Sequence, residues 1–246
     1  MSLTSTDFPY KSFKKFFNRN EKTEMSDDCK KVKATSTGTI ISPDGIVLAA
    51  NHAVGRNELP TVLFNGKNYP AKVLKRIPLL DVMVLKIKTD KNDFPYSPVA
   101  DSRSLKLGDP LFLIGYPNPE IQGQFPKLTK TYYSATKGFS GDKTMFQISA
   151  DQASGASGSG VFNEKGHLIG VFLLKLVGSD SPDVLIPNNV SFCSKSCYFF
   201  KALEPYLTGD IADKAIKPKT ESENIENTAK TTVMVLSYGK RESEKK

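Results

Sequence analysis

The sequence feature that most constrains the fold is a glycine- and serine-rich stretch, Asp151–Phe162, which reads DQASGASGSGVF. Half of its twelve residues are glycine or serine, and strand-like sequence brackets it at Met145–Ser149 and His167–Leu174. A glycine-rich turn between strands indicates that the backbone adopts positive φ or approaches another part of the chain closely. Such a turn can present a serine hydroxyl beside outward-pointing backbone N–H groups. We therefore expect this stretch to be a functional turn rather than a linker.

Two successive sets of short β-type runs surround this turn, separated by turn signals such as PDG at 43–45 and NGKN at 65–68. The first set is Ser36–Ser42, Ile46–Ala50, Thr61–Phe64, Tyr69–Lys75 and Val82–Ile87. The second set is Leu111–Gly115, Leu128–Ala135, Thr144–Ala150, Gly160–Phe162, Leu168–Leu174 and Val190–Cys193. Lys195–Leu207 follows with apolar residues at helical spacing, and Pro205 is expected to end that helix early. The pattern predicts an all-β fold with a C-terminal helix, built as two small barrels or as a sandwich.

Composition fits a packed globular chain, because 39% of its 246 residues are hydrophobic and 24% are charged. It has no run of about 18 apolar residues, so no transmembrane segment is expected. The N-terminus shows no ordinary signal peptide, which makes the cytoplasm the default location; unconventional secretion or effector export is the alternative. The three cysteines, Cys29, Cys193 and Cys197, form neither a metal-binding pattern nor a disulfide framework. We expect neither a metal nor a cofactor.

The net charge of +8 fits either a solvated surface or contact with an anionic surface. No known nucleic-acid motif accompanies the charge, so no specific nucleic-acid partner is expected.

Three residues in chain order could form a catalytic constellation: His52, Asp81 and Ser157. His52 directly follows an apolar strand, where a histidine can serve as a general base. Asp81 borders another apolar strand, and a carboxylate there is costly to bury unless it has a partner such as an imidazole N–H. Ser157 has a glycine two residues before it and another directly after it. The order base, orienting acid and nucleophile is one of several that lead to the same chemistry.

The segments around these residues resemble the trypsin-like serine peptidases. They are ANHAV at His52, LLDVMVLKI at Asp81 and GASGSGVFNEKGHLIGVF at Ser157. They are most similar to the bacterial-type branch that includes the HtrA/Deg proteases and the glutamyl endopeptidases. GTIISPDGIVLAANHAV and SRSLKLGDPLFLIGYP resemble two further HtrA segments, so the resemblance covers Thr35–Leu207.

The resemblance implies two Greek-key, six-stranded β-barrels with the site in the cleft between them. It places barrel one at about 34–105, barrel two at about 106–194 and a helix at about 195–207, all within a peptidase domain at 34–208. Residues 1–33 are then an N-terminal extension and 209–246 a polar C-terminal tail. Within that tail, Thr231–Tyr238 is expected to be an edge strand or a docking segment. About 40 residues follow the helix, so no PDZ domain is expected.

The family also implies a role for each site residue. His52 would be the general base, Asp81 would hold its tautomer, and Ser157 would attack the scissile carbonyl. The backbone N–H groups of Gly155 and Ser157 would form the oxyanion hole. Ala156 stands where digestive trypsins carry an acid that pairs with a freed N-terminus, so activation by that route is not expected. Leu173 stands where trypsins have a serine that supports the triad acid.

The S1 pocket of this fold would draw on Asp151, Phe172 and Phe192. An acid six residues before the nucleophile would select Lys or Arg at P1, whereas the two phenylalanines would make the pocket shallow and apolar. The function that follows is a serine endopeptidase acting on protein or peptide substrates. The alternative is a catalytically weak binding module with the protease fold.

Overall fold

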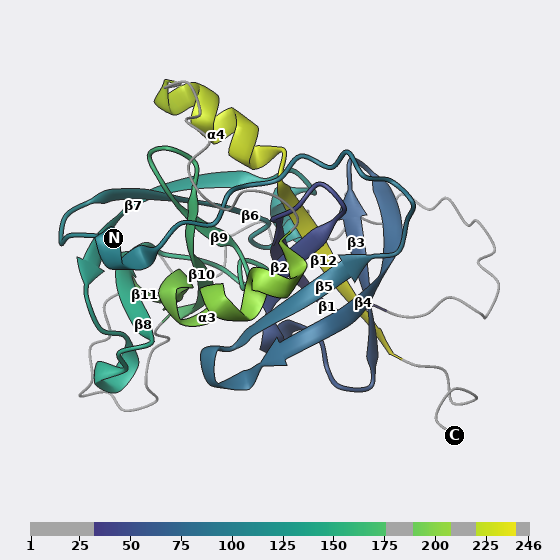
Figure 1. The fold of residues 1–246 in the computed structure, drawn as a ribbon, viewed down its shortest axis with the longest axis horizontal. Coiled ribbons are helices and arrows are strands. Elements are labelled where there is room, and N and C mark those ends of the chain that lie inside the picture. Colours follow the sequence, from purple (N-terminus) through teal and green to yellow (C-terminus); the bar gives the residue numbers. More distant parts are fainter. Residues whose placement is uncertain (1–31, 176–188, 208–219, 240–246) are drawn as a thin grey trace, which may run out of the picture. The chain divides into compact units, whose positions relative to one another are not determined.

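The computed structural model of the chain describes residues 32–175, 189–207 and 220–239. These residues form two closed six-stranded barrels built from antiparallel pairs (Figure 1). Closure of both sheets confirms the two-barrel arrangement and excludes the sandwich. Most of the expected extension, residues 1–31, lies outside the described residues.

Barrel one has the strand order β1-β12-β3-β4-β5-β2. Its strands are β1 (Val32–Ile40), β2 (Ile46–Ala50), β3 (Glu58–Phe64), β4 (Lys67–Ile77), β5 (Val82–Ile87) and β12 (Thr232–Gly239). The β3–β4 hairpin follows from its turn residues: Asn65 and Gly66 take φ of 48° and 74°. Positive φ at both central positions is what a two-residue turn needs to match the twist of its strands.

Barrel two has the order β10-β11-β8-β7-β6-β9. Its strands are β6 (Pro110–Gly115), β7 (Lys127–Ala135), β8 (Met145–Ser149), β9 (Gly160–Asn163), β10 (Leu168–Lys175) and β11 (Val190–Lys195). The short helix α2 (Pro119–Gln122) lies between β6 and β7, and α3 (Ser196–Leu203) follows β11. Pro205 lies in the 3-10 turn η5 (Glu204–Tyr206) that succeeds α3, so the helix does end early, as predicted.

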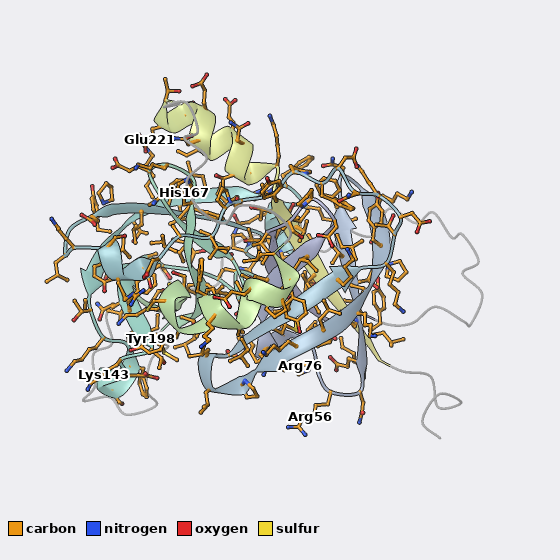
Figure 2. The ribbon with its side chains drawn as sticks, in the orientation of Figure 1. Arg56, Arg76, Lys143, His167, Tyr198 and Glu221 are labelled. Atoms are coloured by element: carbon orange, nitrogen blue, oxygen red, sulfur yellow. The ribbon has the colours of Figure 1, made fainter. Side chains whose placement is uncertain are left out.

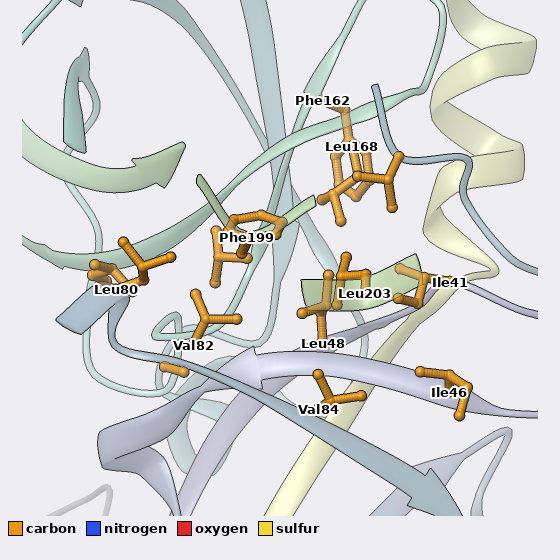
Figure 3. Packing of buried hydrophobic residues seen from close by; sticks show 14 of the residues in the cluster. Ile41, Ile46, Leu48, Leu80, Val82, Val84, Phe162, Leu168, Phe199 and Leu203 are labelled. Atoms are coloured by element: carbon orange, nitrogen blue, oxygen red, sulfur yellow. The ribbon is translucent and has the colours of Figure 1, made fainter. Parts of the chain in front are cut away.

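The apolar residues divide into one cluster inside each barrel and a third between the barrels. Alternate residues of β2 show why its sequence is apolar throughout: Val47 and Ala49 fill barrel one, whereas Leu48 and Ala50 face the inter-barrel cluster. That third cluster also holds Phe162 and Leu168 of barrel two, and Phe199 and Leu203 of α3 (Figure 3). The helix therefore seals the junction between the two barrels.

The C-terminal residues differ from the polar tail expected over 209–246. Thr220 and Glu223 form a capping box that starts α4 (Glu221–Ala229), and β12 follows. β12 is no edge strand, because it pairs with β1 on one side and β3 on the other. Val233 and Val235 are buried in the core of barrel one. The sixth strand of barrel one thus comes from the end of the chain and not from residues 34–105.

Further contacts fix this C-terminal segment to both barrels. The Asn224 side chain donates to the Glu164 carbonyl in the β9–β10 turn at 2.9 Å. Thr231 exchanges a hydrogen bond with the Ser97 hydroxyl at 2.8 Å, and its carbonyl accepts from Ile40 at 2.9 Å. Residues 220–239 are therefore part of the folded domain.

Candidate active site

His52 and Asp81 meet where two neighbouring strands of barrel one join their connecting turns. His52 lies in η1 (Asn51–Ala53), directly after β2, and Asp81 lies between η2 (Pro78–Leu80) and β5. The register pairs Ala50 with Val82, so the residues just beyond this pair lie close together. His52 Nδ1 is 2.5 Å from Asp81 Oδ2, and the His52 backbone N–H donates to Asp81 Oδ1 at 2.9 Å. The expected pairing of the aspartate with the imidazole is present.

The carboxylate sets the electrostatics of this pair. The hydrogen bond to Asp81 raises the pKa of His52, partial burial lowers that pKa, and the negative charge of Asp81 raises it further, for a net increase. An ionised carboxylate can only accept, so Nδ1 carries the proton and Nε2 presents its lone pair when the ring is neutral. Among the described residues, Nε2 has no hydrogen-bond partner.

Arg76 of β4 holds the turn that carries His52, a role the sequence did not indicate. Its Nη1 donates to the Asn51 side chain at 2.9 Å and to the Asn51 carbonyl at 3.2 Å. Its Nη2 donates to the Gly55 carbonyl at 3.2 Å. Figure 2 shows Arg76 together with Arg56, an exposed arginine of the same barrel. The sequence signal was weak, because Arg76 is one of several basic residues on an alternating strand.

The glycine-rich stretch forms a tight turn between β8 and β9. Gly155 and Gly158 take φ of 90° and 87°, which other residues adopt only with strain. A Cβ on Gly158 would lie 2.1 Å from the Thr37 carbonyl oxygen and 2.9 Å from the Ala50 nitrogen. A Cβ on Gly155 would lie 2.5 Å from the Tyr116 carbonyl oxygen. The turn therefore packs against barrel one, beside the residues that lead into His52.

Each of the four successive carbonyls from Ser154 to Ser157 accepts a hydrogen bond. The Ser154 carbonyl accepts from the Asn118 N–H at 2.6 Å, and the Ala156 carbonyl accepts from the Ser159 hydroxyl at 2.6 Å. Thr37 holds the carbonyls of Gly155 and Ser157, each at 2.9 Å. In a trans peptide the N–H points opposite to the carbonyl, so these bonds also orient the N–H groups. Within the described ranges, the N–H groups of Gly155 and Ser157 donate to no protein acceptor.

The Ser157 hydroxyl is half-buried and donates to the Leu173 carbonyl of β10 at 3.1 Å. The structure records no hydrogen bond between Ser157 and His52 among the described residues. Leu173 itself is buried, and its hydrocarbon side chain has no hydroxyl to offer the aspartate. The structure therefore brings His52 and Asp81 into contact and places the serine turn beside their barrel.

The residues expected at the S1 pocket lie in different surroundings. Phe172 is 2% exposed and belongs to the core of barrel two, so it presents almost no surface. Phe192 is 4% exposed and its ring meets the Phe139 ring edge-to-face, with centroids 6.1 Å apart. Asp151 is exposed. Their part in specificity stays a prediction.

The second histidine belongs elsewhere. His167, labelled in Figure 2, follows the turn between β9 and β10. Its backbone N–H donates to the Asn163 side chain at 3.0 Å. Cys193 is buried in barrel two, and burial raises the pKa of its thiol well above the ordinary value.

Among the residues that the structure describes, no group of three or more His, Cys, Asp or Glu side chains could hold a metal ion. No helix of these residues is long and apolar enough to cross a membrane.

The fold has two barrels, with a histidine–aspartate pair at the end of the first and a glycine-rich serine turn in the second. This combination is typical of the trypsin-like peptidases. The trypsin-like peptidase domain family matches residues 36–171, more than half of the chain, and the chain belongs to that family. The resemblance seen in the sequence is therefore confirmed.

Curated relatives lie in the DegP and HtrA group. A probable periplasmic serine endoprotease DegP-like from Pseudomonas putida is 32% identical over 167 residues, which cover 65% of this chain and 34% of that protein. The serine protease Do-like HtrB of Bacillus subtilis is 28% identical over 202 residues, covering 76% of this chain and 44% of that protein. The chain thus matches less than half the length of these relatives.

A crystal structure of the serine endoprotease from Yersinia pestis resembles this fold with a TM-score of 0.56 and 24% identity. The match covers 70% of this chain and 57% of that one. This likeness supports the fold alone.

The expectation of a cytoplasmic location is wrong. The relatives from Pseudomonas putida and Chlamydia pneumoniae are both named as periplasmic serine endoproteases, which points away from the cytoplasm. The expectation rested only on the absence of an ordinary signal-peptide pattern in the sequence.

Proposed function

We propose that the chain is a serine endopeptidase that hydrolyses peptide bonds in protein substrates through an acyl-enzyme. The observation that carries this proposal is the bond of 2.5 Å between His52 Nδ1 and Asp81 Oδ2. It commits one ring nitrogen to the carboxylate and leaves the other as a base. Family membership and the serine endoprotease relatives support the same reaction.

In the proposed reaction, His52 Nε2 takes the proton of the Ser157 hydroxyl as Ser157 Oγ attacks the substrate carbonyl carbon. The carbonyl π electrons move to its oxygen, and the N–H groups of Gly155 and Ser157 stabilise that oxyanion. When the oxyanion collapses, the C–N bond breaks and protonated His52 gives its proton to the leaving amine. In the second half of the reaction, His52 takes a proton from water as the water oxygen attacks the acyl carbon. When that tetrahedral intermediate collapses, the bond between the acyl carbon and Ser157 Oγ breaks, His52 returns the proton to Ser157 Oγ, and the carboxylic acid product leaves.

The Ser157 hydroxyl must turn from the Leu173 carbonyl toward His52 for this reaction. A turn about one side-chain bond changes the acceptor of a serine hydroxyl without moving the backbone. The bond to Leu173, 3.1 Å long, is also the observation that favours the second candidate, a catalytically weak binding module. In that case the hydroxyl would stay on Leu173 and the fold would bind proteins without cleaving them.

Cleavage of an unfolded protein such as reduced casein separates the two functions. The endopeptidase proposal predicts new peptides with the wild-type chain and none with Ser157→Ala. Ser104→Ala, which changes an exposed serine outside the site, serves as the matched control and should cleave like wild type. If the wild-type chain binds casein but does not cleave it, the result would favour the binding module.

We further propose that the substrates are proteins outside the cytoplasm, and the periplasmic names of the relatives support this.

Asp151, exposed before the turn, would favour Lys or Arg at P1, and a cleavage profile of a peptide library without that preference would remove Asp151 from specificity. The net charge of +8 would add contact with anionic surfaces, which salt would weaken.

A further inference from the structure

We propose that Thr37 is a positioning residue that fixes the oxyanion turn, and that it does so from a strand held in place by the C-terminal strand β12. The inference rests on the proposed function, because it concerns the same serine turn. Thr37 lies in the middle of β1, in the other barrel from Ser157. Its side chain is fully buried.

Thr37 uses its hydroxyl and its backbone N–H on this turn. The hydroxyl donates to the Gly155 carbonyl at 2.9 Å and accepts from the Tyr116 N–H at 2.9 Å. The direction is unambiguous, because a backbone N–H can only donate and a carbonyl can only accept. The backbone N–H of Thr37 donates to the Ser157 carbonyl at 2.9 Å.

These bonds hold the Gly155–Ala156 and Ser157–Gly158 peptide groups, which lie on either side of the peptide that carries the Ser157 N–H. Thr37 anchors two of the four held carbonyls directly, those of Gly155 and Ser157. It reaches a third through Tyr116, since the same loop supplies the Asn118 N–H that binds the Ser154 carbonyl at 2.6 Å. The Gly155 N–H belongs to the Ser154–Gly155 peptide, so its direction depends on that anchor. Thr37 touches neither His52 nor Asp81 in the described contacts, so it acts through the turn.

The strand that carries Thr37 is held by the C-terminal segment. In the β1–β12 register Thr37 stands opposite Met234, and β2 pairs with β1 only from Gly38 onward. β12 is therefore the neighbour strand that fixes the backbone at Thr37. Gly158 lies so close to the Thr37 carbonyl that no side chain fits between them. The position of the serine turn between the barrels therefore depends on the position of β1.

Thr39 offers a matched control on the same strand. It lies two residues on, so its side chain shares the face of Thr37, and it is 1% exposed. Its hydroxyl has no hydrogen-bond partner among the described residues. Thr→Val at either position keeps the shape and removes a hydroxyl, but only at Thr37 does it break a hydrogen bond to the serine turn, the one to the Gly155 carbonyl.

The experiment measures the second-order rate constant of fluorophosphonate labelling per folded molecule for wild type, Thr37→Val, Thr37→Ser and Thr39→Val. Thermal unfolding gives the folded fraction of each variant. We expect Thr37→Val to label on the order of 100-fold more slowly, as for a catalytic group displaced by about 1 Å. Thr37→Ser retains the hydroxyl and should label within a few-fold of wild type, as should Thr39→Val. The pH midpoint of labelling should not move in Thr37→Val, because His52 keeps its partner.

Equal rate constants per folded molecule for wild type and Thr37→Val would overturn the inference and leave the proposed function standing. If Thr37→Val does not fold, a loss of labelling in folded Thr37→Ser as large as 100-fold would also overturn it, because the hydroxyl would then not be the cause. Failure of the wild-type chain to label would overturn the proposed function and this inference with it.

Discussion

Asp81 shows at the level of one residue how the chain fixes its candidate base. It adopts a left-handed conformation with φ 50° and ψ 38°, which costs a non-glycine residue about 1–2 kcal/mol. That conformation lets its backbone N–H close the preceding 3-10 turn on Pro78, while its carbonyl accepts from Asn51 at 2.8 Å. The carboxylate then receives two bonds from His52. The backbone strain is therefore offset by a network that orients the imidazole.

The reactivity of the serine should depend on pH through His52. The base must be neutral, and the bond to Asp81 raises the pKa of His52 above the ordinary 6.5. The labelling rate should therefore fall as the pH drops through a midpoint above that value. For stability the sign is opposite: the protonated ring stabilises the fold below the unfolded pKa, and this contribution disappears as the pH rises through the folded pKa.

Asp81→Asn is the control for this pH profile. An amide carries no charge, so the midpoint should move to lower pH, and the plateau should fall by about 10⁴-fold because the tautomer is no longer fixed. The pH dependence of fluorophosphonate labelling measures both. An unchanged midpoint in Asp81→Asn would show that the carboxylate does not set the pKa of His52.

Arg76 should contribute to both stability and reactivity, because it holds the turn that bears His52. Arg76→Leu removes three hydrogen bonds to Asn51 and Gly55 and should lower the free energy of unfolding by about 1–3 kcal/mol. It should also slow labelling, because the turn bearing His52 loosens. Arg56→Leu, at an exposed position, should leave both quantities near wild type. Urea unfolding of the two variants tests this, and equal losses would contradict the assigned role.

At the level of elements, the serine turn and the two strands beside it carry the site. The sequence predicted this turn well, because its glycines and its flanking strands are local signals. It also predicted the approach of Asp81 to His52, since a carboxylate bordering an apolar strand needs a partner. It did not reveal Thr37 or Arg76, because their partners are distant in the chain and their own segments are ordinary strand sequence. The direction of the Ser157 hydroxyl likewise depends on the packing of β10.

The turn predicts a contrast between two glycines. Gly158 and Gly141 both have positive φ, but a Cβ on Gly141 meets nothing within 4 Å, whereas one on Gly158 meets the Thr37 carbonyl at 2.1 Å. Gly141→Ala should lower the free energy of unfolding by about 1–2 kcal/mol, which is the backbone strain alone. Gly158→Ala should lower it by more than about 3 kcal/mol, because backbone atoms of barrel one must also move. Chemical unfolding measures both, and equal losses would mean that the turn does not pack on β1 as described.

At the level of the whole molecule, the feature that matters is the closure of barrel one by the end of the chain. The strand pattern left two barrels or a sandwich open, and the resemblance to trypsin-like peptidases implied two barrels, but residues 209–246 were expected to be a tail. A short apolar run such as residues 231–238 has no local signal that says which strands it joins. The pairing of β12 with β1 joins residues nearly 200 positions apart, as in Thr37 and Met234, and only the register of the folded chain reveals it.

Removal of β12 tests this closure. A chain ending at Thr231 leaves facing edges of β1 and β3 unpaired and removes Val233 and Val235 from the core of barrel one. Each buried valine contributes about 1.5–3 kcal/mol, and each kcal/mol is worth about 2–4 °C in a domain of this size, so the melting temperature should fall by about 6–24 °C. The exposed edges should also promote aggregation.

The matched control for that truncation is a chain ending at Gly239, which retains every described strand. It should melt near the temperature of the full chain. Calorimetry of the three forms decides the matter, and equal melting temperatures for the chains ending at Thr231 and Gly239 would contradict the role of β12.

The most direct test of the central claim is to locate the residue that a fluorophosphonate modifies. The full chain is labelled, digested and analysed by peptide mass spectrometry, alongside Ser157→Ala, Asp81→Asn and the exposed-serine control Ser104→Ala. We expect one phosphonylated residue, Ser157, in wild type and Ser104→Ala, strongly reduced labelling in Asp81→Asn and none in Ser157→Ala. Equal, weak labelling of wild type and Ser157→Ala would contradict the claim that this turn carries an activated nucleophile.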